Sequence, residues 1–358
     1  MDRRSTTLFA ITGAALALAL GLTTAPAVAL MAPVSAGPPK PVKVAHLEFN
    51  GFFPGTTRIH VGDSVSFAIN GFHTVTFLAS EQAPPPLIIP APSNPITGRL
   101  DSAGAGFWFN GKPNLVINPL VAAPTGGNTY TGTGELSSGL PAPTGPAKPF
   151  VVTFTKAGTF IFNCLVHPGM KGVVKVLPKG GPVPSAAADR RRADAQLKAG
   201  IAEARRLSTV KPAPATVLAG HDGNGAVSWW RFFPQTLKIK AGTTVDFRIS
   251  SKREVHTITI GPAPYTSKIE ETFTTPQPNP GGPPSLIVSP LAGYPSDPPP
   301  LPAETGSNHG NGFVNTGILS NGGGGLASSV KITFTKPGIY DYECVIHPKM
   351  DGKIVVTK

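Results

Sequence analysis

The chain has few charged residues, which make up 14% of its 358 positions, against about 25% in typical globular domains. Combined with 40% hydrophobic residues, this composition excludes the highly charged, weakly hydrophobic class of disordered chains. Only two cysteines occur, Cys164 and Cys344, too few for a disulfide-stapled scaffold. Beyond the N-terminal region, no hydrophobic run reaches the roughly 20 residues of a membrane-spanning helix. We therefore expect folded domains and no transmembrane span in the mature chain.

Glycine and proline are abundant, with 41 residues of each. Both interrupt helices, because glycine is too free in its backbone and proline lacks the amide hydrogen that a helix needs. Short strands joined by long turns fit this composition better than a helical bundle. The length allows two domains of ordinary size. The composition therefore predicts an all-β, loop-rich protein with two domains.

The formal net charge of +12 is the clearest guide to partners. The 31 lysines and arginines are mostly scattered along the chain and form no long basic stripe. This pattern argues against nucleic acid as a partner. It fits attraction to an acidic protein or an anionic surface.

The N-terminus has the features of an export signal. Arg3 and Arg4 precede an apolar run at 8–22, which small residues follow. Cleavage is plausible after Ala29 or after Ala36, since both end a small-x-small triplet. We predict a signal peptide within residues 1–36, and hence an exported protein in the periplasm, at the cell surface or outside the cell.

Much of the remaining sequence occurs twice. Phe52-Phe53-Pro54 recurs as Phe232-Phe233-Pro234, and the segment 164–170 recurs as 344–350, both 180 positions later. A repeat of about 180 residues has the size of a domain. We predict a tandem duplication, with domain 1 at 37–178, domain 2 at 212–358 and a linker at 179–211.

Alternating apolar residues at 57–69 and again at 237–249 predict strands in each copy, and such short strands are typical of a β-sandwich or barrel. The linker differs, because its Ala- and Arg-rich segment 185–207 contains no proline and begins with Ser185, a good helix cap. It predicts a solvated helix. Two Pro- and Gly-rich stretches, 81–149 and 261–329, are far longer than ordinary loops and are expected to be insertions.

Each copy carries a histidine on a β segment, followed much later by Cys-x2-His-x2-Met. The lone histidines are His73 and His256, which are 183 positions apart. Two imidazoles, a thiolate and a thioether form the donor set of a blue (type 1) copper site, with methionine as the weak axial ligand. Zinc would recruit further cysteine or histidine rather than methionine. A catalytic Cys–His pair would leave the repeated methionines unexplained.

On these motifs the sequence resembles the cupredoxin family, within it the amicyanin and plastocyanin branch. The short Cys-x2-His-Pro-x-Met loop and the aromatic segments before Cys164 and Cys344 resemble that branch, and the resemblance covers about half of each domain. It implies two tandem Greek-key β-sandwiches. It also implies two type 1 copper ions, one bound by His73, Cys164, His167 and Met170 and the other by His256, Cys344, His347 and Met350.

Two further expectations follow from the resemblance. Thr74 and Thr257 stand where the family commonly has asparagine, and their hydroxyls are expected to brace the ligand loop. The ring edges of His167 and His347 are expected to reach the surface through an apolar patch and pass electrons to a redox partner protein. The function implied is that of an electron carrier rather than an enzyme.

Two alternatives stay open. A two-domain multicopper oxidase or nitrite-reductase-like enzyme would need additional copper bound by further histidines. The four other histidines form no His-x-His pair and flank no cysteine; they are His46, His60, His221 and His309. A copper storage or delivery protein would use the same ligands, and the sequence does not separate it from a carrier.

Overall fold

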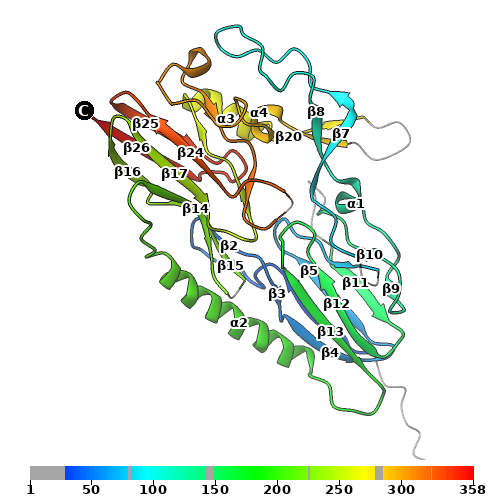
Figure 1. Ribbon diagram of the computed structural model, residues 1–358. Coiled ribbons are helices and arrows are strands. Elements are labelled where there is room, and N and C mark those ends of the chain that lie inside the picture. The colour runs from blue at the N-terminus through cyan, green and yellow to red at the C-terminus, as the bar shows by residue number, and fades with distance from the viewer. Residues whose placement is uncertain (1–28, 80–81, 142–147, 225, 279–284, 324) are drawn as a thin grey trace, which may run out of the picture.

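The structure is a computed structural model that describes residues 29–79, 82–141, 148–224, 226–278, 285–323 and 325–358. It is mostly β, as predicted, with one group of sheets for each copy of the repeat (Figure 1). Most of the predicted signal peptide, residues 1–28, lies outside the described residues. None of the described helices is both long and apolar enough to cross a membrane.

Domain 1 is built from two five-stranded sheets that enclose one hydrophobic core. One sheet has the order β3 (Phe52–Phe53), β1 (Met31–Ala36), β5 (Ser64–Ile69), β11 (Phe150–Phe154) and β9 (Thr129–Tyr130). The other has the order β10 (Leu136–Ser137), β6 (Thr76–Phe77), β12 (Gly158–Asn163), β13 (Lys171–Leu177) and β4 (Thr56–His60).

Domain 2 repeats this arrangement. One sheet has the order β2 (Leu47–Phe49), β15 (Val227–Phe233), β14 (Thr216–Asp222), β17 (Thr243–Ile249) and β24 (Ser329–Phe334). The other has the order β16 (Thr236–Lys240), β26 (Asp351–Thr357), β25 (Gly338–Glu343), β19 (Thr259–Ile260) and β22 (Val314–Asn315). The parallel pairs β1–β5 and β4–β13 of domain 1 recur as β14–β17 and β16–β26, so the duplication extends to strand pairing.

Equivalent aromatic residues fill the two cores. Phe162 of β12 contacts Phe52 and Phe67 at ring-centroid distances of 4.5 and 5.0 Å. In domain 2, Tyr342 of β25 contacts Phe232 and Phe247 at 4.7 and 5.4 Å. Each set packs edge to face, a favourable geometry for aromatic pairs. Phe162 and Tyr342 belong to the strands that lead to Cys164 and Cys344, so this packing anchors those strands in the two cores.

The first domain begins earlier than the expected boundary at 37. Strand β1 lies between β3 and β5, and its Ala32, Val34 and Ala36 are buried in the core. Cleavage after Ala36 would remove this strand from the middle of a sheet. Of the two expected cleavage positions, only the one after Ala29 leaves β1 intact.

The two copies share a sheet that the sequence did not indicate. Strand β2 lies between β1 and β3 of domain 1 in sequence, yet it pairs with β15 at the edge of a domain 2 sheet. The insertions also pair with each other, because β7 (Ile88–Pro95) and β8 (Pro113–Ile117) join β21 (Ser285–Val288) and β20 (Thr274–Gln277) in one four-stranded sheet. The insertions therefore connect the domains.

Several short elements complete the insertions and their surroundings. They are α1 (Pro119–Ala122), α3 (Ala263–Glu271), α4 (Pro290–Gly293), the single 3-10 turn η1 (Asn308–Gly310) and the paired strands β18 (Val255–His256) and β23 (Leu319–Ser320). They place Phe107 and Phe109 of the first insertion in one apolar cluster with Phe313 of the second.

The helix expected at 185–207 is present as α2 (Ala186–Leu207), and Ser185 caps it by accepting a hydrogen bond from the Ala188 amide. The expectation of a solvated helix was wrong for one of its faces. Leu197 and Ala204 pack with Phe49 and Trp229, and the Trp229 indole donates to the Ala204 carbonyl. Helix α2 lies along both domains (Figure 1) and contacts β1, β3 and β15.

His309 joins the two insertions through a pair of carboxylates. Its Nδ1 lies 3.0 Å from Asp101 of the first insertion, and its Nε2 lies 3.0 Å from Asp297 of the second. Burial raises the pKa of the Asp101 carboxyl. Hydrogen bonds from His309 and from the Ala105 and Ala103 amides lower it by more than burial raises it, so the pKa lies below the ordinary 3.8.

The Asp101→Asn protein is therefore expected to be less stable than its parent at neutral pH. A depressed folded-state pKa contributes stability that is complete above the unfolded-state value and is lost as the pH falls through the folded-state value. The difference in unfolding free energy should stay constant from pH 7 to about 5 and shrink below about 4. Denaturant unfolding across that range measures it. Asp341→Asn, at an exposed carboxylate, is the control; an equal pH dependence in both variants would contradict the prediction.

Candidate metal centres

The first centre brings together three of the predicted ligands of domain 1. His73 lies in the loop between β5 and β6, Cys164 directly follows β12, and His167 lies in the turn to β13. The Cys164 Sγ is 3.9 Å from His73 Nδ1 and 3.5 Å from His167 Nδ1, and the two Nδ1 atoms are 3.1 Å apart. Met170 is buried in the same core cluster as Cys164.

The second centre repeats this geometry in domain 2. The Cys344 Sγ is 3.8 Å from His256 Nδ1 and 3.5 Å from His347 Nδ1. Met350 is buried beside Cys344 in the domain 2 core. In both centres the same nitrogen of each imidazole faces the sulfur, as a shared metal ion would require.

A tight turn places the three C-terminal residues of each group. The Cys164 amide donates to the Met170 carbonyl at 2.9 Å, and the Met170 amide donates to the His167 carbonyl at 3.1 Å. Equivalent bonds join Cys344, His347 and Met350. The turn needs a left-handed residue before the methionine. Gly169 supplies it with φ of 77°, whereas Lys349 adopts φ of 64° despite its side chain.

Thr74 and Thr257 brace the ligand turns, as expected. The Thr74 hydroxyl accepts from the Leu165 amide at 2.8 Å, and the Thr257 hydroxyl accepts from the Val345 amide at 3.0 Å. The amide of each threonine also points to the cysteine sulfur of its centre, at 3.4 Å in both cases. Each threonine therefore ties the loop of the first histidine to the turn that follows the cysteine.

Thr257→Val is expected to lower the unfolding free energy by about 1–3 kcal/mol, because the buried Val345 amide loses its acceptor. Denaturant unfolding of the copper-free protein measures this. The control is Thr244→Val, which removes an exposed hydroxyl on β17 and should change stability by less than about 0.5 kcal/mol. Equal losses in the two variants would show that the brace adds no stability.

The surroundings favour thiolates in both centres. Burial raises the pKa of Cys164, but hydrogen bonding to and positive charge on His167 and His73 lower it well below the ordinary value. Cys344 shows the same net direction, caused by His347 and His256. The thiolate is the form of cysteine that binds metals.

The donor set fits copper. Within the described part of the chain, these two groups are the clusters of three or more metal-ligating side chains close enough to share an ion. Each combines two imidazole nitrogens, one thiolate and a nearby buried methionine, the donor set of a type 1 copper site. None of His46, His60, His221 and His309 belongs to either group.

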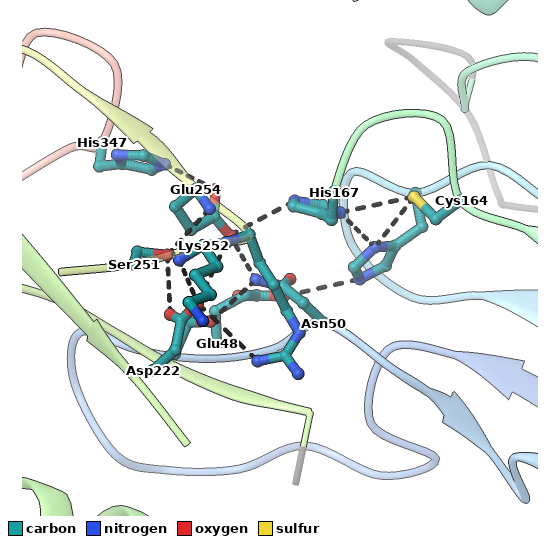
Figure 2. Close-up of polar contacts among 12 residues, drawn as sticks. Glu48, Asn50, Cys164, His167, Asp222, Ser251, Lys252, Glu254 and His347 are labelled. Atoms are coloured by element: carbon teal, nitrogen blue, oxygen red, sulfur yellow. Dashed lines mark hydrogen bonds and ion pairs between the residues drawn. The ribbon is translucent and has the colours of Figure 1, made fainter. Parts of the chain in front are cut away.

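The expectation that His167 and His347 reach the surface was wrong. Their side chains are only 6% and 8% exposed, because the two centres face each other across the contact between the domains. The carboxylate of Glu254 lies between them, with Oε1 3.4 Å from His167 Nε2 and Oε2 3.4 Å from His347 Nε2 (Figure 2). Both ring edges therefore face the Glu254 carboxylate rather than solvent.

Sequence reasoning missed Glu254, Glu48 and Asn50. Glu48 Oε1 lies 3.7 Å from His73 Nε2, and Asn50 donates to both Glu254 and Ser228. One indication was available for Glu254. At the offset of 183 that relates His73 to His256, its counterpart is Gly71, so a charged residue replaces a glycine two positions before a ligand.

No family model matches the chain, and no curated protein matches it. Among solved structures, it is similar to a copper(I) form of an amicyanin variant, with 17% identity over 42% of this chain and 89% of that one and a TM-score of 0.22. A fern plastocyanin variant has 17% identity, 40% and 99% coverage and a TM-score of 0.21. A purple cupredoxin from Nitrosopumilus maritimus has 17% identity, 40% and 98% coverage and a TM-score of 0.20. Each of these three solved structures aligns with about two fifths of the chain.

Proposed function

We propose that this chain is an exported copper-binding electron-transfer protein with two type 1 copper centres, and that it is a carrier rather than an enzyme. The observation that carries the proposal is the buried group of two Nδ1 atoms and one Sγ that occurs once in each domain. The ligands of one ion would be His73, Cys164, His167 and Met170. Those of the other would be His256, Cys344, His347 and Met350.

Contacts outside the ligand set help to hold these ligands in place. The turn bonds, the threonine braces and the aromatic cores fix the cysteine and both histidines in each domain. Bound copper would supply one-electron chemistry between its two oxidation states. A fixed donor geometry that suits both states reduces the rearrangement that accompanies the electron. On the family resemblance, each domain is a Greek-key sandwich with its centre at one end.

Burial of the ligands favours a carrier over a storage or delivery protein. Both cysteines and all four histidines of the two centres are buried. A delivery protein exchanges its metal with a partner, which requires access to the ligands. We therefore expect slow loss of copper to an external chelator, whereas rapid transfer would favour delivery.

The test is a copper(II) titration of the chain without its signal peptide, followed by visible absorption and electron paramagnetic resonance. An intense blue band that saturates at two copper ions per chain supports the proposal. Saturation at one ion would mean that one centre does not bind, and no blue band would refute the proposal. An additional type 2 copper signal would instead favour the multicopper oxidase or nitrite-reductase-like alternative.

A further inference from the structure

Glu254 is in direct contact with ligands of both centres. It lies between β17 and β18 of domain 2, immediately before the segment that carries His256. Its two carboxylate oxygens are divided between the centres, since Oε1 faces His167 and Oε2 faces His347, each at 3.4 Å from Nε2. Figure 2 shows the carboxylate between the two imidazoles.

The direction of these contacts follows from the ligand geometry. In both histidines Nδ1 faces the cysteine sulfur. The nitrogen that remains, Nε2, carries the hydrogen when Nδ1 binds a metal, and it donates to a nearby carboxylate. His167 and His347 therefore both donate to the same anion. Such a partner fixes the ring orientation and makes the imidazole a stronger ligand.

The position of Glu254 is held from both domains. Asn50 of domain 1 donates to its Oε1. On the domain 2 side, the Glu254 amide donates to the Ser251 hydroxyl at 2.9 Å, and that hydroxyl donates to Asp222 at 2.7 Å (Figure 2). The carboxylate is 6% exposed. It is therefore a fixed, buried link rather than a mobile surface side chain.

The charge of this carboxylate acts on both centres. Its two oxygens lie 3.4 Å from an imidazole of each centre, and it is buried away from solvent that would screen it. A buried anion stabilises the more positive, oxidised state of a nearby metal, and in a low dielectric its effect is strong.

We propose that Glu254 couples the two centres, so that His167, Glu254 and His347 form an internal path for electron exchange and one carboxylate sets the reduction potential of both. The proposal rests on the proposed function. In each exchange one electron leaves a copper(I) centre, which becomes copper(II), and reduces copper(II) in the other centre to copper(I). No proton or atom is transferred, and no outside reductant is needed.

The alternative is that Glu254 only clamps the domains together. Glu254→Gln separates the two roles, because it keeps the shape of the side chain and removes its charge. Glu48→Gln is the matched control, since Glu48 faces His73 of one centre only. In the Cys344→Ala background only the reduction potential of the first centre is measured. In the Cys164→Ala background only that of the second centre is measured. Denaturant unfolding of each copper-free variant measures the structural contribution alone.

Glu254→Gln should make the potentials of both centres more positive, whereas Glu48→Gln should affect the first centre only. Electron exchange is followed after rapid partial reduction of the two-copper protein, in a Met170→Gln background that makes the centres spectrally distinct through the axial ligand. Electrons redistribute between the two centres of one chain in a phase that does not depend on protein concentration. This phase should be at least about tenfold slower in Glu254→Gln. It should stay close to the parent rate in Glu48→Gln.

Glu254→Asp provides a second variant if Glu254→Gln does not fold. It keeps the charge, but its shorter side chain cannot reach both imidazoles, so redistribution should slow with little change in the potentials. An unchanged rate of electron redistribution in either Glu254 variant would overturn the coupling. So would a shift in the potential of only one centre in Glu254→Gln. Either result would leave the two blue centres and the proposed function intact. A parent protein with no blue band would overturn both.

Discussion

Copper added to the Cys344→Ala protein is expected to give about half of the blue absorbance of the parent, all of it from the domain 1 centre. The thiolate is responsible for the intense colour of a type 1 centre, and alanine supplies no donor in its place. The domain 1 donors are held by a separate pair of sheets with its own core, so their geometry should be retained. Visible absorption at saturating copper measures the result.

Cys164→Ala is the matching variant in domain 1, and in it the domain 2 centre should be the one that remains blue. The double variant should be colourless. Electron paramagnetic resonance adds a check, because each single variant should show one type 1 signal. Full parental absorbance in either single variant would refute the assignment of that cysteine as a ligand, and loss of all colour would mean that the centres do not form independently.

Phe49→Ala should be among the most destabilising single substitutions in the chain, with a loss of about 3–5 kcal/mol in unfolding free energy. Phe49 belongs to β2, is fully buried, contacts the ring of Phe53 and shares a core cluster with Trp229 and with Leu197 of α2. Its removal leaves a cavity where domain 1, domain 2 and the helix meet. Denaturant unfolding of the copper-free protein measures the loss.

The control for Phe49→Ala is Ile161→Ala, which truncates a side chain on β12 that is 55% exposed. Its expected effect is within about 0.5 kcal/mol. A loss below about 1 kcal/mol in Phe49→Ala would show that this cluster is not tightly packed.

The features that were predictable from the sequence are those that depend on local patterns. The Cys-x2-His-x2-Met motif lies within one turn, so its spacing alone brings Cys164, His167 and Met170 together. The recurrence of the motif at a fixed offset made chance agreement implausible. Helix α2 was predictable for the same reason, because its cap, its helix-forming residues and the flanking prolines are all adjacent in sequence.

The contact between the copies was not predictable in this way. Strand β2 is only three residues long, and nothing in Leu47–Phe49 indicates that it pairs with β15 rather than with its own domain. The pairing of β8 with β21 joins residues about 170 positions apart, and both segments are short apolar runs that suit many partners. The burial of His167 and His347 follows from these long-range contacts, which is why the surface expectation failed.

Glu254 of the second copy corresponds to Gly71 of the first, and only a covalently duplicated chain permits such a difference at this contact. If two identical copies met at this contact, every residue at its centre would occur twice. Two facing carboxylates would repel each other at close range, and one of them would take up a proton. In a single chain the copies can differ at this position. A single carboxylate can therefore lie between His167 and His347 without a second copy of itself facing it, which an assembly of identical subunits cannot achieve.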